Sequence, residues 1–126
     1  MPLSVQATIP ILRIFDLVKA REFYLDFMGF KVDWEHRFED AAPVYMQVSR
    51  DRLVLHLSEH YGDATPGSKV YVSVTGIADF HRELTASKYG YLRPGLEESG
   101  WGSKCMEITD PFGNRLRFDE KMEQGQ

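Results

Sequence analysis

Hydrophobic residues alternate with charged ones on both sides of the segment Asp110–Gly113, near the end of the chain. A period of two residues is typical of strands whose two faces have different surroundings. The segment Asp-Pro-Phe-Gly is typical of a turn, because Asp bonds the backbone ahead of it, Pro presets φ and Gly fits the fourth position. Residues 101–118 are therefore predicted to form a β-hairpin.

A weaker copy of this hairpin lies earlier in the chain, and the spacing between matching positions is constant. Met46 and Met106 are 60 residues apart, and so are Leu17 and Ile77, which open two stretches of helical periodicity. A fixed offset of this kind indicates an internal repeat. The alternative is a coincidence between two ordinary α+β halves, but the type, order and spacing of the elements all recur.

The predicted elements follow the order strand–helix–strand–strand–strand, and this order occurs twice. They are a strand at 7–15, a helix from the N-cap Asp16 to Gly29, strands at 30–38, 44–48, 53–57 and 69–75, a helix from Ile77 to Gly90, a short strand at 91–92, and the final hairpin. Neither half can close a core alone. We therefore expect one α+β domain over 1–126, in which modules at about 5–58 and 68–119 form curved mixed sheets with outer helices.

Composition narrows the classes of function. The 126 residues are 43% hydrophobic, enough for one core, and the net charge of −4 without a basic stripe argues against a nucleic-acid partner. No apolar run reaches the ~18 residues of a membrane span, and the first residues lack a signal-peptide pattern. The single cysteine, Cys105, fits a reducing compartment, so we expect a cytoplasmic protein with no membrane partner.

Three segments give the chain a family resemblance: Phe23-Tyr24 in the first helix, Leu25–Phe30 at its end, and Asp110–Asn114 in the last turn. Together with the doubled module, they resemble the vicinal oxygen chelate superfamily, which includes glyoxalase I, extradiol dioxygenases and bleomycin-resistance proteins. The likeness covers nearly the whole chain and implies the glyoxalase/bleomycin-resistance fold. Because one fold hosts many functions, the chemistry has to be argued from the site.

The enzymes of this superfamily hold a divalent metal at four inward-facing positions, two from each module. By register, the resemblance places Ile9, His56, Lys69 and Arg117 at these positions. Only His56 can bind a metal, since Ile9 has no donor atom and the other two are cations. The resemblance therefore implies no metal, no cofactor and no catalytic residue. A metalloenzyme that uses other donors around His56 is the alternative; the candidates are Glu59, His60 and Glu107.

The resemblance is closest to the non-enzymatic bleomycin-resistance proteins, in three places. Ala7–Leu12 is similar to their first strand, whose proline accompanies an exchange of that strand between subunits. Ser99–Gly102 is similar to their Trp-Gly segment, where the Trp stacks on the flat bithiazole of the drug. Trp34–Asp40 is similar to their aromatic and acidic third strand and loop, although His36 and Arg37 make it less acidic here. The implied protein is a homodimer with a swapped first strand.

The resemblance and the residue types define an expected ligand-binding set, which is Trp34, Glu35, Phe38, Glu39, Asp40, His56, Tyr61, Trp101 and Gly102. Aromatic rings supply contact area, and carboxylates attract cationic groups. Several of these residues have an ordinary structural alternative. Trp101 can pack on the core of its own chain. Trp34 and Phe38 share a face of one predicted strand, and both can belong to the core or to a subunit interface. His56 can be a hydrogen-bonded interior group.

The leading hypothesis is a dimeric protein that sequesters a bleomycin-type glycopeptide in grooves between its subunits, without chemical modification of the drug. A metal-dependent lyase or dioxygenase of the same superfamily is one alternative, and a binder of another small metabolite is the other. Metal content separates the enzyme from the binders, and a ligand screen separates the drug from other metabolites.

Overall fold

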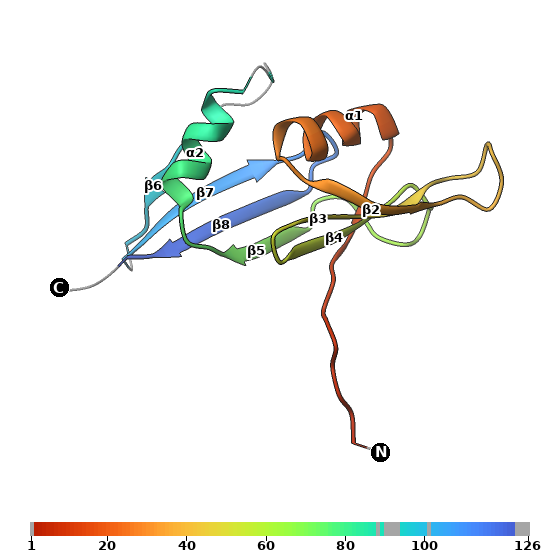
Figure 1. Cartoon of the computed structure of the whole chain (residues 1–126), viewed down its shortest axis with the longest axis horizontal. Coiled ribbons are helices and arrows are strands. Elements are labelled where there is room, and N and C mark those ends of the chain that lie inside the picture. The colour runs from red at the N-terminus through yellow and green to blue at the C-terminus, as the bar shows by residue number, and fades with distance from the viewer. Residues whose placement is uncertain (1, 88, 90–93, 101, 123–126) are drawn as a thin grey trace.

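The computed structural model describes residues 2–87, 89, 94–100 and 102–122, which form two four-stranded sheets with helices on one side (Figure 1). In chain order the elements are β1 (Ile11–Arg13), α1 (Leu17–Arg21), the π-helix η1 (Glu22–Phe27), β2 (Lys31–His36), β3 (Tyr45–Arg50), β4 (Leu53–Ser58), β5 (Lys69–Ser73), α2 (Ile77–Thr85), β6 (Glu97–Glu98), β7 (Ser103–Thr109) and β8 (Arg115–Lys121). No helix in these residues is long and apolar enough to cross a membrane.

The two sheets have the same topology. Their strand orders are β1-β4-β3-β2 and β5-β8-β7-β6, and in each sheet the first strand runs parallel to the last strand of its module. The remaining pairs are antiparallel. The predicted α+β fold with two βαβββ modules is therefore confirmed. Both helices lie above the sheets in Figure 1, so each sheet keeps one face free of helices, which we call its open face.

Alternation along each strand divides its side chains between the core and the open face. In β4, Leu55 and Leu57 are fully buried in the core, whereas His56 between them points to the open face and is half-buried. In β8, Leu116 and Phe118 are buried in the same way. The predicted orientation of His56, opposite to its leucine neighbours, is confirmed.

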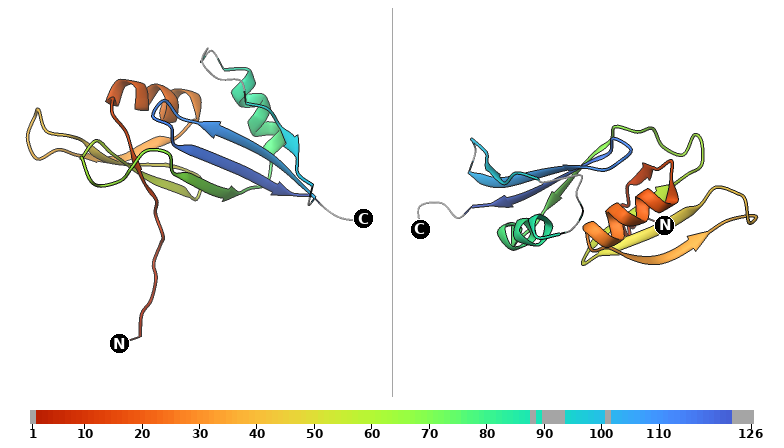
Figure 2. Two further views of the ribbon diagram at one scale, coloured as in Figure 1. Left: turned by 180° about the vertical axis from the view of Figure 1, so that it is seen from behind. Right: turned by 90° about the horizontal axis from the view of Figure 1, so that it is seen from above.

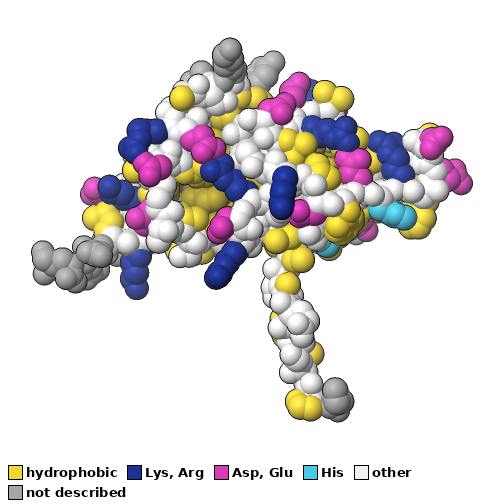
Figure 3. Space-filling view, viewed as in Figure 1, with side chains coloured by type: hydrophobic (Ala, Val, Ile, Leu, Met, Phe, Trp, Pro, Cys, Tyr) yellow, Lys and Arg dark blue, Asp and Glu magenta, His cyan; other side chains and the backbone are white. Residues whose placement is uncertain are grey.

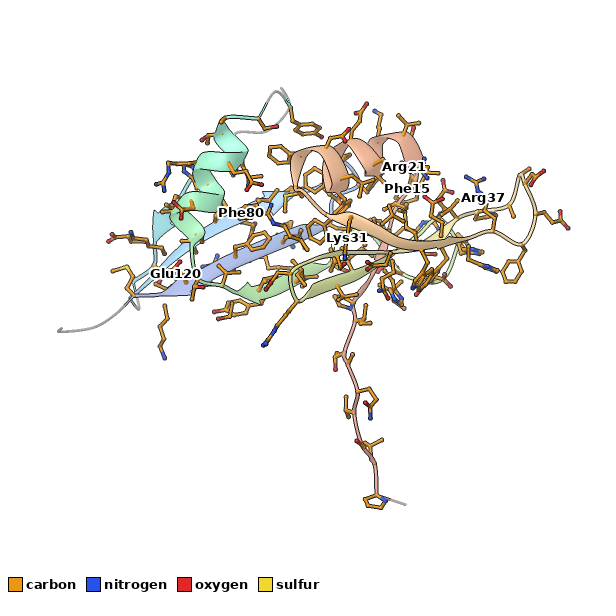
Figure 4. All side chains as sticks on the ribbon, viewed as in Figure 1. Phe15, Arg21, Lys31, Arg37, Phe80 and Glu120 are labelled. Atoms are coloured by element: carbon orange, nitrogen blue, oxygen red, sulfur yellow. The ribbon has the colours of Figure 1, made fainter. Side chains whose placement is uncertain are left out.

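The helices begin where the sequence indicates, but they are capped differently. The Asp16 carboxylate accepts a hydrogen bond from the Lys19 backbone N–H at 3.0 Å, which is the expected N-cap of α1. The first helix then continues as η1. Helix α2 follows Gly76, which has no side chain to serve as a cap and adopts a φ of +81°. Glu120 of β8 replaces the cap by accepting from the Ile77 N–H at 2.8 Å (Figure 4).

A buried hydrogen bond joins the first helix to the last turn of the chain. The Tyr24 hydroxyl donates to Asp110 Oδ2 at 2.6 Å, and both side chains are buried. Asp110 Oδ1 also accepts from the backbone N–H groups of Phe112 and Asn114, and the Asn114 amide donates to the Arg13 carbonyl. Burial, together with the Asp110 charge and hydrogen bond, raises the pKa of Tyr24 well above its ordinary value. The predicted turn therefore also connects the two modules.

A second connection between the modules lies at the end of β3. Arg50 donates to the Met28 carbonyl at 2.8 Å, forms an ion pair with Glu83 of α2 at 2.7 Å, and stacks 4.7 Å above the Phe80 ring. Figure 4 shows Phe80 extending from α2 towards the sheets. Next to this cluster is a cavity of about 810 Å³, which charged side chains border on the face seen in Figure 3. Its apolar lining includes Ile9, Leu53, Val70, Val72, Val74 and Phe118.

The first strand is shorter than predicted. Strand β1 contains only Ile11–Arg13, and residues 2–10 form an extended arm that projects away from the sheets (Figures 1 and 2). Two of its apolar side chains are open to solvent, Leu3 at 91% and Val5 at 68% exposure. Pro10 precedes the point where pairing with β4 begins, and a proline donates no hydrogen bond to a ladder. The Pro10 carbonyl still accepts from the His56 N–H of β4 at 3.0 Å, but residues 2–9, which were predicted to contribute to the first strand from Ala7 onwards, belong to no strand in the described part of the chain.

Two other predicted boundaries differ from the structure. Strand β6 is Glu97–Glu98, where the sequence predicts no strand between residue 92 and the final hairpin, because it pairs with Lys104 and Cys105 of β7. The short strand predicted at 91–92 lies outside the described residues. Strand β8 continues to Lys121, beyond residue 118 where the predicted hairpin ends, because pairing with β7 extends to Ser103.

Candidate functional site

An aromatic cluster lies on the open face of the first sheet, built by three neighbouring strands. Trp34 of β2, Tyr45 of β3 and His56 of β4 contribute one ring each. The rings of Trp34 and Tyr45 are parallel within 10°, with centroids 5.9 Å apart, and the His56 ring lies edge-on at 5.2 Å from both. Trp34 remains 42% exposed. The cluster therefore offers a fixed indole face on which a flat ligand can stack.

A β-bulge in β2 determines which side chains reach this face. Val32 pairs with Val48 and packs on the core, but Trp34 pairs with Gln47, so the register shifts between them and Asp33 is the additional residue. Without the shift, Trp34 would have pointed to the core with Val32. The bulge also directs Glu35 to the helix side, where it forms an ion pair with Arg21 of α1. Figure 4 shows Arg21 above the sheet, on the helix side.

A chain of hydrogen bonds runs beside the rings. The Tyr45 hydroxyl lies 2.7 Å from His56 Nδ1, and His56 Nε2 lies 3.0 Å from Gln47 Oε1. The Gln47 amide donates to Asp33 Oδ2 at 3.0 Å, and Ser49 donates to Asp33 Oδ1 at 3.0 Å. These two bonds, first that from Gln47, lower the pKa of Asp33, and burial lowers the pKa of His56. Both ring nitrogens of His56 are thus engaged, and the imidazole is neutral at pH 7.

Of the other predicted aromatic and acidic residues of the first module, Phe38 is linked to the cluster through the ring of His60. Phe38 lies after the end of β2 and is 76% exposed. Its ring centroid is 6.3 Å from that of His60, and the centroid of the His60 ring is 6.5 Å from that of Tyr45. The prediction that Trp34 and Phe38 occupy one strand is therefore wrong, since the strand ends at His36. The remaining members of this group are exposed; they are Glu39, Asp40 and Tyr61.

Of the two predicted residues in the second module, only one can be placed. Trp101 lies outside the described residues. Gly102 has a φ of +85°, a conformation that favours glycine, and its carbonyl accepts from the Met122 N–H at 3.0 Å. This bond attaches the loop before β7 to the end of β8.

Charged side chains occupy the open face of the second sheet. Lys69 forms an ion pair with Glu107 at 2.7 Å, and this contact, ahead of other influences, lowers the pKa of Glu107. Arg117 lies 3.7 Å from Asp119, whose carboxylate is buried and has an oxygen without a hydrogen-bond partner. The Lys69–Glu107 pair joins two half-exposed side chains, so it contributes little to stability and mainly adds charge to the face.

The residues at the four superfamily metal positions do not fit a metal. In the described part of the chain, no three His, Cys, Asp or Glu side chains lie close enough together to hold an ion. Lys69 and Arg117 present cations, and both nitrogens of His56 are already hydrogen-bonded. Of the other donors considered, Glu59 accepts from the Val44 N–H at 3.0 Å.

Sequence reasoning missed three residues that complete the cluster: Asp33, Tyr45 and Gln47. Tyr45 and Gln47 alternate with buried Met46 in β3, so their shared face could have been read from the sequence. Their position opposite His56 depends on the β3–β4 register, which pairs Gln47 with His56. Asp33 had no sequence signal, because nothing in the alternation of β2 reveals the bulge.

Comparisons with known proteins agree with this fold. A family model described as "Glyoxalase superfamily protein" matches residues 2–125, so the chain belongs to the glyoxalase superfamily and the predicted relationship is confirmed. A bleomycin-binding protein complexed with bleomycin is 24% identical with a TM-score of 0.69, and the match covers 93% of this chain and 99% of that one. A search of curated proteins found no match.

Two further solved structures show how widely the fold is used. A glyoxalase-related enzyme from Clostridium phytofermentans is 20% identical, with a TM-score of 0.75 and coverage of 95% of this chain and 98% of that one. TnmS3, an antibiotic-binding protein from Streptomyces sp. CB03234, is 16% identical, with a TM-score of 0.70 and coverage of 95% and 99%. The same fold thus supports binding proteins and an enzyme, and the function has to be argued from the site.

Proposed function

We propose that this chain is a dimeric, non-catalytic binding protein of the cytoplasm that sequesters a flat antibiotic of the bleomycin type. The observation that carries the proposal is the open face of the first sheet, where a 42% exposed Trp34 is held parallel to Tyr45 beside a neutral His56. An indole held in this way loses little freedom when a ligand ring stacks on it. The similarity to a bleomycin-binding protein supports the drug class.

Charge on the surrounding segments complements the rings. Glu39 and Asp40 are exposed in the loop after β2, near Phe38, and no cation on that loop other than Arg37 offsets them. Arg37 instead donates to the Asp40 and Ala42 carbonyls at 3.0 and 3.3 Å. Exposed carboxylates of this kind increase the rate at which a cationic ligand arrives, and they add less to the final affinity.

A second copy of the chain would complete the groove. The open faces of both sheets leave large side chains uncovered, including Tyr71 at 64% exposure, and the arm exposes Leu3 and Val5. Strands β1 and β5 are both edge strands in their sheets. Unpaired edges and apolar side chains of this kind favour association, and the arm can exchange between subunits. The ligand would then lie between the open face of one subunit and its partner.

Calorimetric titration tests the function directly. Wild-type protein is expected to bind metal-free or copper-loaded bleomycin, and Trp34→Ala to weaken binding by roughly 10- to 100-fold, the usual effect of losing a stacked aromatic ring. Val18→Ala is the matched control, since Val18 is exposed on the far side of the first helix. Wild-type protein that does not bind bleomycin, or Trp34→Ala that binds as wild type does, would refute the proposal.

A different flat metabolite is the second candidate ligand for the same face. The rings and the hydrogen-bond chain that favour stacking are not specific for one drug, so the same contacts suit other planar molecules. A thermal-shift screen of planar metabolites distinguishes the two, because a ligand that binds the folded protein raises its melting temperature, and a tighter ligand raises it further at the same concentration. Protein stabilised by such a compound but not by bleomycin would replace the drug in this proposal.

A further inference from the structure

The series of hydrogen bonds beside Trp34 runs from Asp33 through Gln47 and His56 to Tyr45, and the direction of each bond follows from the charge of Asp33. The two hydrogen bonds to Asp33 keep its carboxylate ionised at neutral pH, so that it only accepts hydrogen bonds. Gln47 must therefore turn its NH₂ group towards Asp33, at 3.0 Å, and its carbonyl oxygen towards His56. The orientation of this amide is fixed by chemistry, because the reverse orientation would place two acceptors against each other.

The orientation of Gln47 determines the tautomer of His56. Since Gln47 Oε1 can only accept, His56 Nε2 carries the hydrogen and donates across 3.0 Å. A neutral imidazole has a single N–H, so Nδ1 is an acceptor and receives the Tyr45 hydroxyl hydrogen across 2.7 Å. The Tyr45 oxygen has then used its only hydrogen. What it retains for a ligand is its capacity to accept.

We propose that Asp33 and Gln47 are positioning residues that fix the Tyr45 oxygen as a hydrogen-bond acceptor beside Trp34, so that the site selects flat ligands with an N–H or O–H donor at the ring edge. The inference rests on the proposed function, because it takes this open face as the ligand surface. Trp34 and Tyr45 are parallel within 10°, so a ligand ring stacked on the indole lies parallel to the plane of the phenol, near which its oxygen directs lone pairs. A ligand with only acceptors there meets an unfavourable contact.

Other groups near Tyr45 preserve this arrangement. Burial, followed by the charge of Asp63, raises the pKa of Tyr45, so the phenol stays protonated. Asp63 is itself held by a hydrogen bond from Ser58 at 2.6 Å. The His60 ring is 6.5 Å from Tyr45, and the nearest cation on β1, Arg13, donates to the Glu59 carbonyl at 2.8 Å. The acceptor character of Tyr45 therefore depends on His56, and through it on Asp33.

Nuclear magnetic resonance of the free protein tests the role of Asp33 without any ligand. In ¹⁵N-labelled wild-type protein at pH 7.5, His56 is expected to be the Nε2–H tautomer. Asp33→Ala removes the acceptor that orients the Gln47 amide, which can then take either orientation, so His56 should become a mixture of the two tautomers. Glu35→Gln, on the same strand but facing the helix side, is the control and should leave the tautomer unchanged. An Nδ1–H tautomer in the wild type, or no change in Asp33→Ala, would overturn the assignment.

Two tricyclic probes test the selectivity. Acridone carries an N–H at its ring edge, whereas acridine has a bare ring nitrogen and is otherwise nearly the same size. Wild-type protein at pH 7.5 should bind acridone roughly 2- to 10-fold more tightly, the range expected for one neutral hydrogen bond. The preference should disappear in Tyr45→Phe and weaken in Asp33→Ala. Equal affinities in the wild type would overturn the donor preference. Binding of neither probe would overturn the donor preference alone, because the bleomycin titration tests the proposed function separately and the tautomer experiment still decides the role of Asp33.

Discussion

The hydrogen bond from Tyr24 to Asp110 allows a quantitative test of how the two modules are held together. Tyr24→Phe removes only the hydroxyl and leaves the ring in the core, where Tyr24 has no exposed surface. A buried hydrogen bond to a carboxylate contributes about 1.5–3 kcal/mol. Asp110 Oδ2 retains the bond from the Asn114 amide at 2.9 Å, so the carboxylate is not left unpaired and the loss should be near the lower limit, about 1.5–2 kcal/mol.

Urea unfolding measures this loss. With a slope of roughly 2 kcal/mol per molar urea, the midpoint of Tyr24→Phe should fall by about 0.8–1 M with no change in slope. All samples need the same protein concentration, because the stability of a dimer depends on it. Tyr71→Phe is the control, since Tyr71 lies exposed on the open face of the second sheet. A loss below about 0.5 kcal/mol in Tyr24→Phe, or an equal loss in both variants, would refute a structural role for this bond.

Four further predictions concern the site and the assembly. Folding lowers the pKa of His56, so as the pH decreases the unfolded chain takes up a proton before the folded one does. The free energy of unfolding should therefore fall as the pH decreases from about 6.5 through the folded-state pKa. His56→Gln should lose this pH dependence, and a pH profile of stability that is the same in His56→Gln and wild type would contradict the prediction. Trp101→Ala should weaken bleomycin binding by roughly 10- to 100-fold with little change in melting temperature, whereas early melting with normal binding would make Trp101 structural. Light scattering after size exclusion should give a dimer for the full chain and a monomer after deletion of residues 1–8, and a monomeric full chain would remove the groove between subunits. Elemental analysis of protein purified without chelators should find no stoichiometric metal, because Ile9, Lys69 and Arg117 stand at three of the four positions where the enzymes of the superfamily have metal ligands. Stoichiometric zinc or iron would contradict this prediction.

The duplicated fold could be predicted from the sequence, because alternation and helical periodicity are local and the repeat made each half a check on the other. The repeat placed His56 and Arg117, which are 61 positions apart, in equivalent strands, and the structure has them in β4 and β8. The site was less accessible. Which side chains surround His56 depends on pairing between β2, β3 and β4, and a sequence pattern shows faces but not partners. Tyr45 therefore passed unnoticed, and Glu35 was grouped with Trp34 although they face opposite sides.

The bulge at Asp33 also bears on how such a site can change during descent. Loss of this one codon would restore regular alternation in β2 and leave Trp34 on the open face and Glu35 on the helix side, because Trp34 would then follow Val32 directly. The aromatic rings would stay in place, but the series of hydrogen bonds would lose its first member, and nothing would then fix the orientation of the Gln47 amide. A change in the length of this strand can therefore alter the polar character of the site while its stacking surface is kept.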